Sequence, residues 1–254
     1  MSTDSIALSL VLPAYNEAGR LPPYLTAVRQ HFDRRYGDGY EVIVVDDGSE
    51  DGLVPLLERS GADWPQLRWL RHPHNQGKGA AVRTGILAAE GRLLLFADAD
   101  GATPIEEECR LAEAIRGGAG LAVGSRLVPA AGIERSRSPV RRLTGRLFAA
   151  VARRLLGLAV RDTRCGFKMF RRDVGRHLFS LAREPGYLFD LEVLALARRF
   201  GYEVAEVPIR WTEVPGGHLS LARELPRILL DLCRLGRRLR REAGSEKCKM
   251  RNAK

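Results

Sequence analysis

Acidic side chains gather at three points of the chain, each directly after a short apolar run typical of a buried strand. Glu17 ends the segment PAYNE, Asp46 and Asp47 follow the run EVIVV, and Asp98 and Asp100 follow the run LLLFA. If these runs are parallel strands, three carboxylate clusters meet at one edge of a sheet, where they repel one another unless cations or hydrogen-bond donors lie among them. One such cluster is commonly a turn or a helix cap, but three together favour a binding site.

The pair Asp98 and Asp100 carries the most specific chemistry of the three clusters. In an extended segment, residues i and i+2 point the same way, so the two carboxylates can share one hard divalent ion whose other ligands are water and diphosphate oxygens. A DxD pair is weak evidence alone, and its position after an apolar strand strengthens it.

A glycine-rich turn with one lysine, Lys78, occupies residues 74–79 and leads into a helical pattern. It matches neither the P-loop nor the dinucleotide-binding pattern. A helix N-terminus of this kind can receive a phosphate or the edge of a ligand. The alternative is a loop that needs glycine for its backbone angles.

The elements that must position these groups alternate between strands and helices, which predicts a mostly parallel sheet flanked by helices on both faces. Ligands of such sheets bind beyond the carboxyl ends of the strands. We expect strands at 6–12, 41–45, 67–70, 93–97 and 121–123, and helices at 21–32, 53–60, 79–90 and 104–116.

The second half of the chain is less regular and strongly basic. An apolar helix with interleaved arginines is expected at 140–156. Residues 219–241 have apolar positions at three- and four-residue steps and a cationic face, which is typical of a helix lying on an anionic membrane surface. The alternative is that this stripe packs on the rest of the chain or on a second subunit. We therefore divide the chain into a main domain, 1–218, which carries the acidic clusters, and a basic amphipathic helix with a flexible tail, 219–254.

The composition excludes several classes of protein. With 254 residues, 45% hydrophobic and 28% charged, the chain can form one large domain, and collagenous, disulfide-scaffold and fully disordered classes are excluded. A formal net charge of +10 suggests an anionic partner. No nucleic-acid-binding module is evident, and aromatic residues are sparse in the basic stretches. Neither a signal peptide nor a membrane-spanning segment is expected.

The histidines and cysteines give no metal-binding pattern. Cys109, Cys165, Cys233 and Cys248 are scattered, without a Cys/His spacing that would build a zinc site, which is typical of reduced cytosolic thiols. His72 and His74 have no partner at ligand spacing, which favours solvated loop residues.

Taken together, the motifs resemble the family 2 glycosyltransferases of GT-A fold, which have a Rossmann-like sheet. These motifs are PAYNE at 13–17, VDDGS at 45–49, NQGKG at 75–79, DADGAT at 98–103 and GSR at 124–126. A narrower resemblance is to dolichyl-phosphate β-glucosyltransferases. It rests on RDTRCGFKMF at 161–170, FDLE at 189–192 and VPIRWTE at 207–213.

The resemblance implies a role for each of these positions. The residues implied to hold the nucleotide sugar are Pro13, Tyr15, Glu17, Asp46, Asp47, Lys78, Gly79 and Asp98. Asp100, with Asp98, would hold a Mg²⁺ or Mn²⁺ ion, which neutralises the leaving diphosphate. The implied grip on the acceptor phosphate is Arg126, Arg137, Ser138 and Arg141, because guanidinium groups match phosphate oxygens in pairs. Asp190 and Glu192 either contact sugar hydroxyls or brace the helix that follows them.

The implied reaction is an inverting transfer of glucose from UDP-glucose to a polyprenyl phosphate, dolichyl or undecaprenyl, at the cytosolic face of a membrane. The product would be β-linked, and the enzyme peripheral to the membrane. A phosphate monoester has a second pKa of about 6, so the acceptor can attack without a general base. The alternatives are GDP-mannose as donor or a soluble phosphorylated acceptor and, in another class, nucleic-acid binding.

Overall fold

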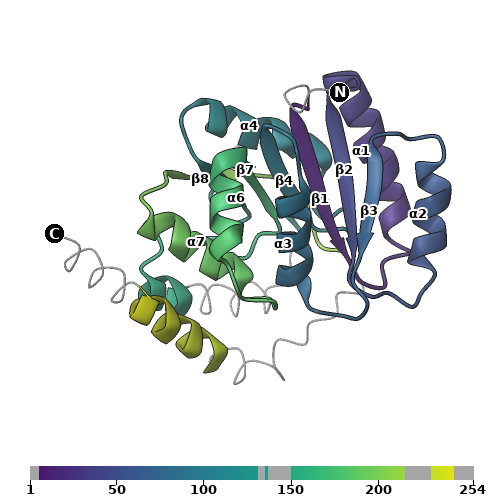
Figure 1. Cartoon of the computed structure of the whole chain (residues 1–254). Helices are drawn as coiled ribbons and strands as arrows, with labels where there is room; N and C mark the ends of the chain where they lie inside the picture. Colours follow the sequence, from purple (N-terminus) through teal and green to yellow (C-terminus); the bar gives the residue numbers. More distant parts are fainter. Residues whose placement is uncertain (1–5, 131–134, 137–149, 215–229, 243–254) are drawn as a thin grey trace.

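The computed structural model describes residues 6–130, 135–136, 150–214 and 230–242 (Figure 1). Arg137, Ser138 and Arg141 lie outside these ranges, as do the first part of the expected helix at 140–156 and residues 215–229 of the C-terminal region. The expectations for those residues are therefore not addressed by the structure.

A seven-stranded sheet forms the centre of the molecule, in the order β3-β2-β1-β4-β7-β5-β8. Its strands are β1 (Leu8–Ala14), β2 (Tyr40–Asp46), β3 (Leu67–Arg71), β4 (Leu93–Ala97), β5 (Leu121–Ser125), β7 (Phe167–Arg171) and β8 (Val204–Pro208). All neighbouring strands run parallel except at β7, which is antiparallel to both β4 and β5. The mostly parallel sheet expected from the sequence is confirmed.

Helices cover both faces of this sheet because its central strands are apolar on both faces. Along β1, Leu8, Leu10 and Leu12 belong to one core and Val11 to the other. The first core includes residues of α1 (Leu21–Tyr36), α2 (Leu53–Gly61), η2 (Ile105–Glu107) and α4 (Glu108–Arg116). The second core includes residues of α3 (Lys78–Ala88), α6 (Arg172–Leu181) and α7 (Phe189–Arg199).

A small second sheet carries the chain past β8 back toward the end of β4. It pairs β6 (Arg135–Ser136) with β9 (Trp211–Thr212). The backbone N–H of Thr212 donates to the carbonyl of Ala102, at 2.9 Å. The segment after β8 is thereby fixed beside the loop that follows Asp98 and Asp100.

The C-terminal helix is described at residues 230–242, where it packs on the core that lies over one face of the sheet. Leu232 and Leu235 are buried in the same core as α7, and Arg238 donates to Glu192 at 2.5 Å. This part of the apolar stripe covers protein, as in the second of the two interpretations of the sequence. Among the described residues, no helix is long and apolar enough to cross a bilayer.

Candidate active site

A cleft of about 430 Å³ opens at the carboxyl ends of β1, β2 and β4, where the sequence predicts the ligand site. The N-terminus of α3 and the turn before α7 complete its wall. The lining residues are Pro13, Ala14, Tyr15, Glu17, Arg20, Asp47, Asn75, Gly77, Lys78, Ala81, Asp98, Ala99, Asp100, Gly186 and Tyr187. Thus six predicted nucleotide-sugar residues, Pro13, Tyr15, Glu17, Asp47, Lys78 and Asp98, meet there, together with Asp100.

The loop after β1 is tied to the loop after β2. Asn16 has a φ of 54°. Its side-chain oxygen accepts a hydrogen bond from the backbone N–H of Glu50, at 3.0 Å, and its backbone N–H donates to the hydroxyl of Ser49, at 2.9 Å. Glu17 accepts two hydrogen bonds from Arg20, a pairing the sequence did not suggest. Two acidic segments far apart in sequence are therefore held at one edge of the cleft.

Asp46 and Asp47 differ in their access to this cleft. Asp47 lines it and accepts hydrogen bonds from the backbone N–H groups of Gln76 and Gly77 and from Nδ1 of His72. Asp46 is fully buried, pairs with Arg71 and is not among the lining residues. The role implied for Asp46, to help hold the nucleotide sugar, stays a prediction.

His72 also differs from its sequence interpretation as a solvated loop residue. It is 8% exposed, with Nδ1 2.7 Å from Asp47 and Nε2 3.0 Å from the hydroxyl of Thr84. The loop histidine instead orients Asp47. His74, two residues later, is exposed, as expected.

The glycines before and within α3 are required by packing. A Cβ on Gly77, whose φ is +102°, would lie 2.4 Å from the carbonyl oxygen of Pro185, and one on Gly79 would lie 2.4 Å from that of Glu184. Gly79 is not among the lining residues. The alternative interpretation, a loop that needs glycine for its backbone angles, therefore explains part of this turn. Lys78, which lies between Gly77 and Gly79, reaches the cleft.

Lys78, Asp98 and Asp100 form the charged part of the cleft. Lys78 Nζ lies 2.5 Å from Asp98 Oδ1. Burial alone would lower the pKa of Lys78, but the charges of Asp98 and Asp190 raise it above its usual value. Burial and the nearby charge of Asp98 raise the pKa of Asp100. Lys78 therefore stays protonated beside the two carboxylates. Its ion pair is with Asp98, and the contacts described for Asp100 include no ion pair with a cation.

This donor set fits a magnesium or manganese ion. Asp98 and Asp100 both line the cleft and offer carboxylate oxygens, which hard divalent cations prefer. Asp100 is held in place by the N–H of Ala102, at 3.0 Å from Oδ1. Burial is the larger cause of the raised pKa of Asp100, and a cation beside this carboxylate would offset the second cause, the repulsion from Asp98.

Arg126 is bound to a partner that the sequence did not indicate. Its Nε and Nη2 donate to the two oxygens of Asp162 at 2.7 and 2.8 Å, and its guanidinium lies over the ring of Trp211, 5.3 Å from the centroid. Despite burial, Arg126 lowers the pKa of Asp162. Arg126 is not among the residues that line the cleft. Its predicted role toward the acceptor phosphate stays a prediction.

Asp190 and Glu192 both lie in the first turn of α7 and are almost fully buried. Asp190 accepts from Nζ of Lys168, at 2.5 Å, and Lys168 was missed although it lies within the motif at 161–170. Glu192 accepts from the backbone N–H groups of Arg183 and Glu184, and so holds the loop that leads to Tyr187 in the cleft wall. These contacts are of the bracing kind, and direct contact with sugar stays a prediction.

Comparison with known protein families identifies the family of this chain. The family model for glycosyl transferase family 2 matches residues 9–179. The chain belongs to glycosyl transferase family 2. The resemblance seen in the sequence motifs is thereby confirmed, and the protein is a glycosyltransferase.

Relatives within this glycosyltransferase family share most of the chain. It is 38% identical to a dolichyl-phosphate beta-glucosyltransferase of Drosophila melanogaster, over 85% of this chain and 70% of the relative. With the enzyme of the same name from Saccharomyces cerevisiae the identity is 34%, over 90% and 74%.

Solved structures share the fold of this glycosyltransferase. Glucosyl-3-phosphoglycerate synthase from Mycobacterium tuberculosis, in complex with Mn²⁺ and UDP-glucose, has a TM-score of 0.65 and 23% identity, covering 90% of this chain and 79% of that one. The expected GT-A architecture is confirmed.

Proposed function

We propose that this glycosyltransferase moves glucose from UDP-glucose to the phosphate of a polyprenyl lipid, dolichyl or undecaprenyl, with inversion to a β linkage. The observation that carries the proposal is the pair Asp98 and Asp100 in the wall of the cleft, in a chain about one third identical to dolichyl-phosphate beta-glucosyltransferases. Structures of the same fold that contain UDP with Mn²⁺ or Mg²⁺ support the choice of donor and metal.

The donor half of the reaction would take place in the cleft. Tyr15, Glu17 and Asp47 line the part formed by β1 and β2 and are suited to the nucleoside, while Lys78 at the start of α3 is suited to phosphate charge. Asp100, assisted by Asp98, would hold the divalent ion. When bound, such an ion neutralises charge that develops on the departing diphosphate.

The acceptor half needs orientation more than proton transfer. A phosphate monoester is largely a dianion at neutral pH, so its oxygen attacks the anomeric carbon directly while the bond to UDP breaks. Arg126, whose plane is fixed by Asp162 and Trp211, would direct its remaining donors to this phosphate. Arg137, Ser138 and Arg141, outside the described residues, complete the proposed grip.

A peripheral position on the cytosolic side of a membrane would bring the enzyme to its lipid acceptor. Arg154, Arg198, Arg199 and Arg240 line a hollow of about 520 Å³ between residues 154–157, α7 and the C-terminal helix. Leu230, at the start of the described helix, is 61% exposed. Basic side chains beside exposed apolar ones are typical of surfaces that bind anionic lipid.

A donor and acceptor panel tests the proposal. Purified protein with Mn²⁺ or Mg²⁺ is offered UDP-glucose or GDP-mannose, each with a short polyprenyl phosphate or with soluble 3-phosphoglycerate. We expect product only from UDP-glucose and the polyprenyl phosphate. Product with GDP-mannose would overturn the donor assignment, and transfer to the soluble acceptor alone would overturn the lipid assignment.

A further inference from the structure

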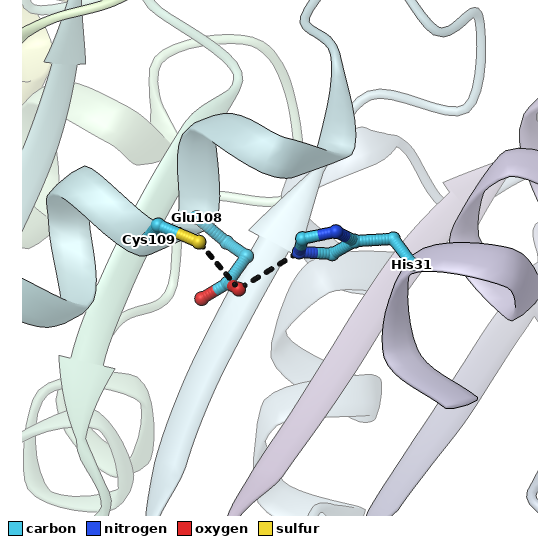
Figure 2. A group of neighbouring side chains, drawn as sticks. All are labelled: His31, Glu108 and Cys109. Atoms are coloured by element: carbon cyan, nitrogen blue, oxygen red, sulfur yellow. Dashed lines mark hydrogen bonds and ion pairs between the residues drawn. The ribbon is translucent and has the colours of Figure 1, made fainter. Parts of the chain in front are cut away.

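A second cluster of metal-binding side chains lies between α1 and α4, and none of its members lines the active-site cleft. It consists of His31 on α1 and the consecutive residues Glu108 and Cys109 on α4. Figure 2 shows the imidazole and the thiol directed at the same carboxylate. Nε2 of His31 lies 3.0 Å from Oε1 of Glu108, and Sγ of Cys109 lies 3.3 Å from that oxygen.

The three donor atoms have the chemistry and the spacing of a zinc site. Imidazole nitrogen, carboxylate oxygen and thiolate sulfur are the ligands that Zn²⁺ takes in proteins. All three atoms lie within 4.8 Å of one another. Bonds of about 2.0 to 2.3 Å in a tetrahedron place ligand atoms about 3.3 to 3.8 Å apart, so small side-chain adjustments would suffice. Within the part of the chain that the structure describes, no other group of three such side chains meets this spacing.

The surroundings of Glu108 hold its carboxylate in a ligating position. The residue is fully buried, and the hydroxyl of Tyr36 donates to Oε2 at 2.9 Å, which fixes the group and leaves Oε1 toward His31 and Cys109. Outer hydrogen bonds of this kind orient the ligands of protein metal sites. His31 and Cys109 are only partly buried, which leaves a route for an ion.

The guanidinium of Arg35 lies beside Glu108, where a metal ion would bind. Arg35 Nε lies 2.8 Å from the same Oε1, and its side chain is 37% exposed, so it can turn to solvent. A buried carboxylate needs a positive partner, and either Arg35 or a metal ion can supply it.

We propose that His31, Glu108 and Cys109 bind one Zn²⁺ that joins α1 to α4, with water as the fourth ligand and Arg35 as the competing cation. On binding, the Cys109 thiol releases its proton to solvent and the sulfur forms the metal bond. Arg35 leaves Oε1.

Cobalt titration of the full chain tests the site, because a thiolate bound to Co²⁺ gives a charge-transfer absorption band. We expect one such band per chain, removed by excess Zn²⁺. It should be lost in Cys109→Ser and His31→Gln but retained in Cys233→Ser, which alters an exposed cysteine, and in Asp100→Asn, which alters the active-site cleft. Arg35→Met should tighten Co²⁺ binding about tenfold, since one hydrogen bond to a charged group no longer competes.

A second readout uses the unaltered protein. Zn²⁺ should protect Cys109 from alkylation while Cys233 stays reactive, as read by mass spectrometry of the peptides. Absence of the band together with absence of protection would overturn the proposal. So would a band that persists in Cys109→Ser, or a weaker binding of Co²⁺ by Arg35→Met.

Discussion

The buried ion pair of Arg126 with Asp162 gives a prediction about stability, and an exposed pair in the same chain serves as its control. Arg126 and Asp162 make two parallel hydrogen bonds, and their side chains are 15% and 6% exposed. Arg171 and Asp173 make the same two bonds, at 2.9 and 2.7 Å, with side chains 49% and 64% exposed. The two pairs share these two side-chain bonds and differ in burial, and Asp162 also accepts the backbone N–H of Arg126, at 2.9 Å.

Replacing either aspartate by asparagine removes the negative charge and leaves one acceptor oxygen. In Asp162→Asn the guanidinium of Arg126 stays buried beside a neutral amide, and breaking a buried pair costs about 3 to 5 kcal/mol. In Asp173→Asn water replaces the lost charge, and an exposed pair contributes about 1 kcal/mol or less. We therefore expect the free energy of unfolding to fall about 2 to 4 kcal/mol further in the first variant than in the second.

Urea unfolding at pH 7, repeated toward pH 3, measures both values. The pKa of Asp162 is lowered in the folded state, so its stabilisation is complete above the unfolded carboxyl pKa of about 3.9 and is lost as the pH falls through the folded pKa. The difference between the unaltered protein and Asp162→Asn should be constant from pH 7 to about pH 5 and narrow below about pH 4. Equal losses of stability in the two variants would refute the reasoning.

Three further predictions concern the cleft and the basic surface. Asp100→Asn should lower kcat at least about 100-fold at saturating Mn²⁺ with an unchanged melting temperature, because an amide binds a hard cation poorly; full activity in a steady-state assay would contradict its role. Gly79→Ala should lower the free energy of unfolding by about 2 kcal/mol because its Cβ meets the Glu184 carbonyl, whereas Gly19→Ala, in open space, should leave it unchanged in the same urea titration. Replacing the exposed Arg237 and Arg241 by alanine should weaken binding to anionic vesicles about 30-fold in a sedimentation assay, at about 1 kcal/mol per arginine. Equal binding by the variant would show that this helix is not part of the membrane-binding surface.

Sequence periodicity was sufficient for the parts of the fold whose pattern is local. The five expected strands are present. Four of them are buried apolar runs, as parallel strands inside a sheet require, whereas the edge strand β3 contains Arg68 and Arg71 and is less buried. The runs of β2 and β4 end where Asp47, Asp98 and Asp100 enter the cleft. β7 could not be placed in the middle of the sheet in this way. Its antiparallel insertion between β4 and β5 depends on pairings with strands far away in sequence.

Two contacts that the sequence did not suggest join distant residues. Lys168 meets Asp190 across 22 positions, and His31 meets Glu108 across 77, so spacing rules based on neighbouring ligands do not reveal either pair. The sequence analysis considered only such spacings for zinc, and a zinc site at His31 stays a proposal.

The C-terminal helix shows a different limit of sequence patterns. An apolar stripe indicates that one face of a helix is buried, but it does not indicate whether lipid or protein covers that face. In the described part, Leu232 and Leu235 are buried in the core of the catalytic domain.

The product of one reaction shows whether this protein transfers glucose to a polyprenyl phosphate. The protein is incubated with UDP-glucose, Mn²⁺ and a short polyprenyl phosphate, and the lipid fraction is analysed by mass spectrometry and by the anomeric coupling constant in NMR. We expect the unaltered protein to form a lipid phosphate that carries one β-linked glucose, and Asp100→Asn to form much less of it. An α linkage, or no glucolipid from a folded protein that binds UDP-glucose, would contradict it.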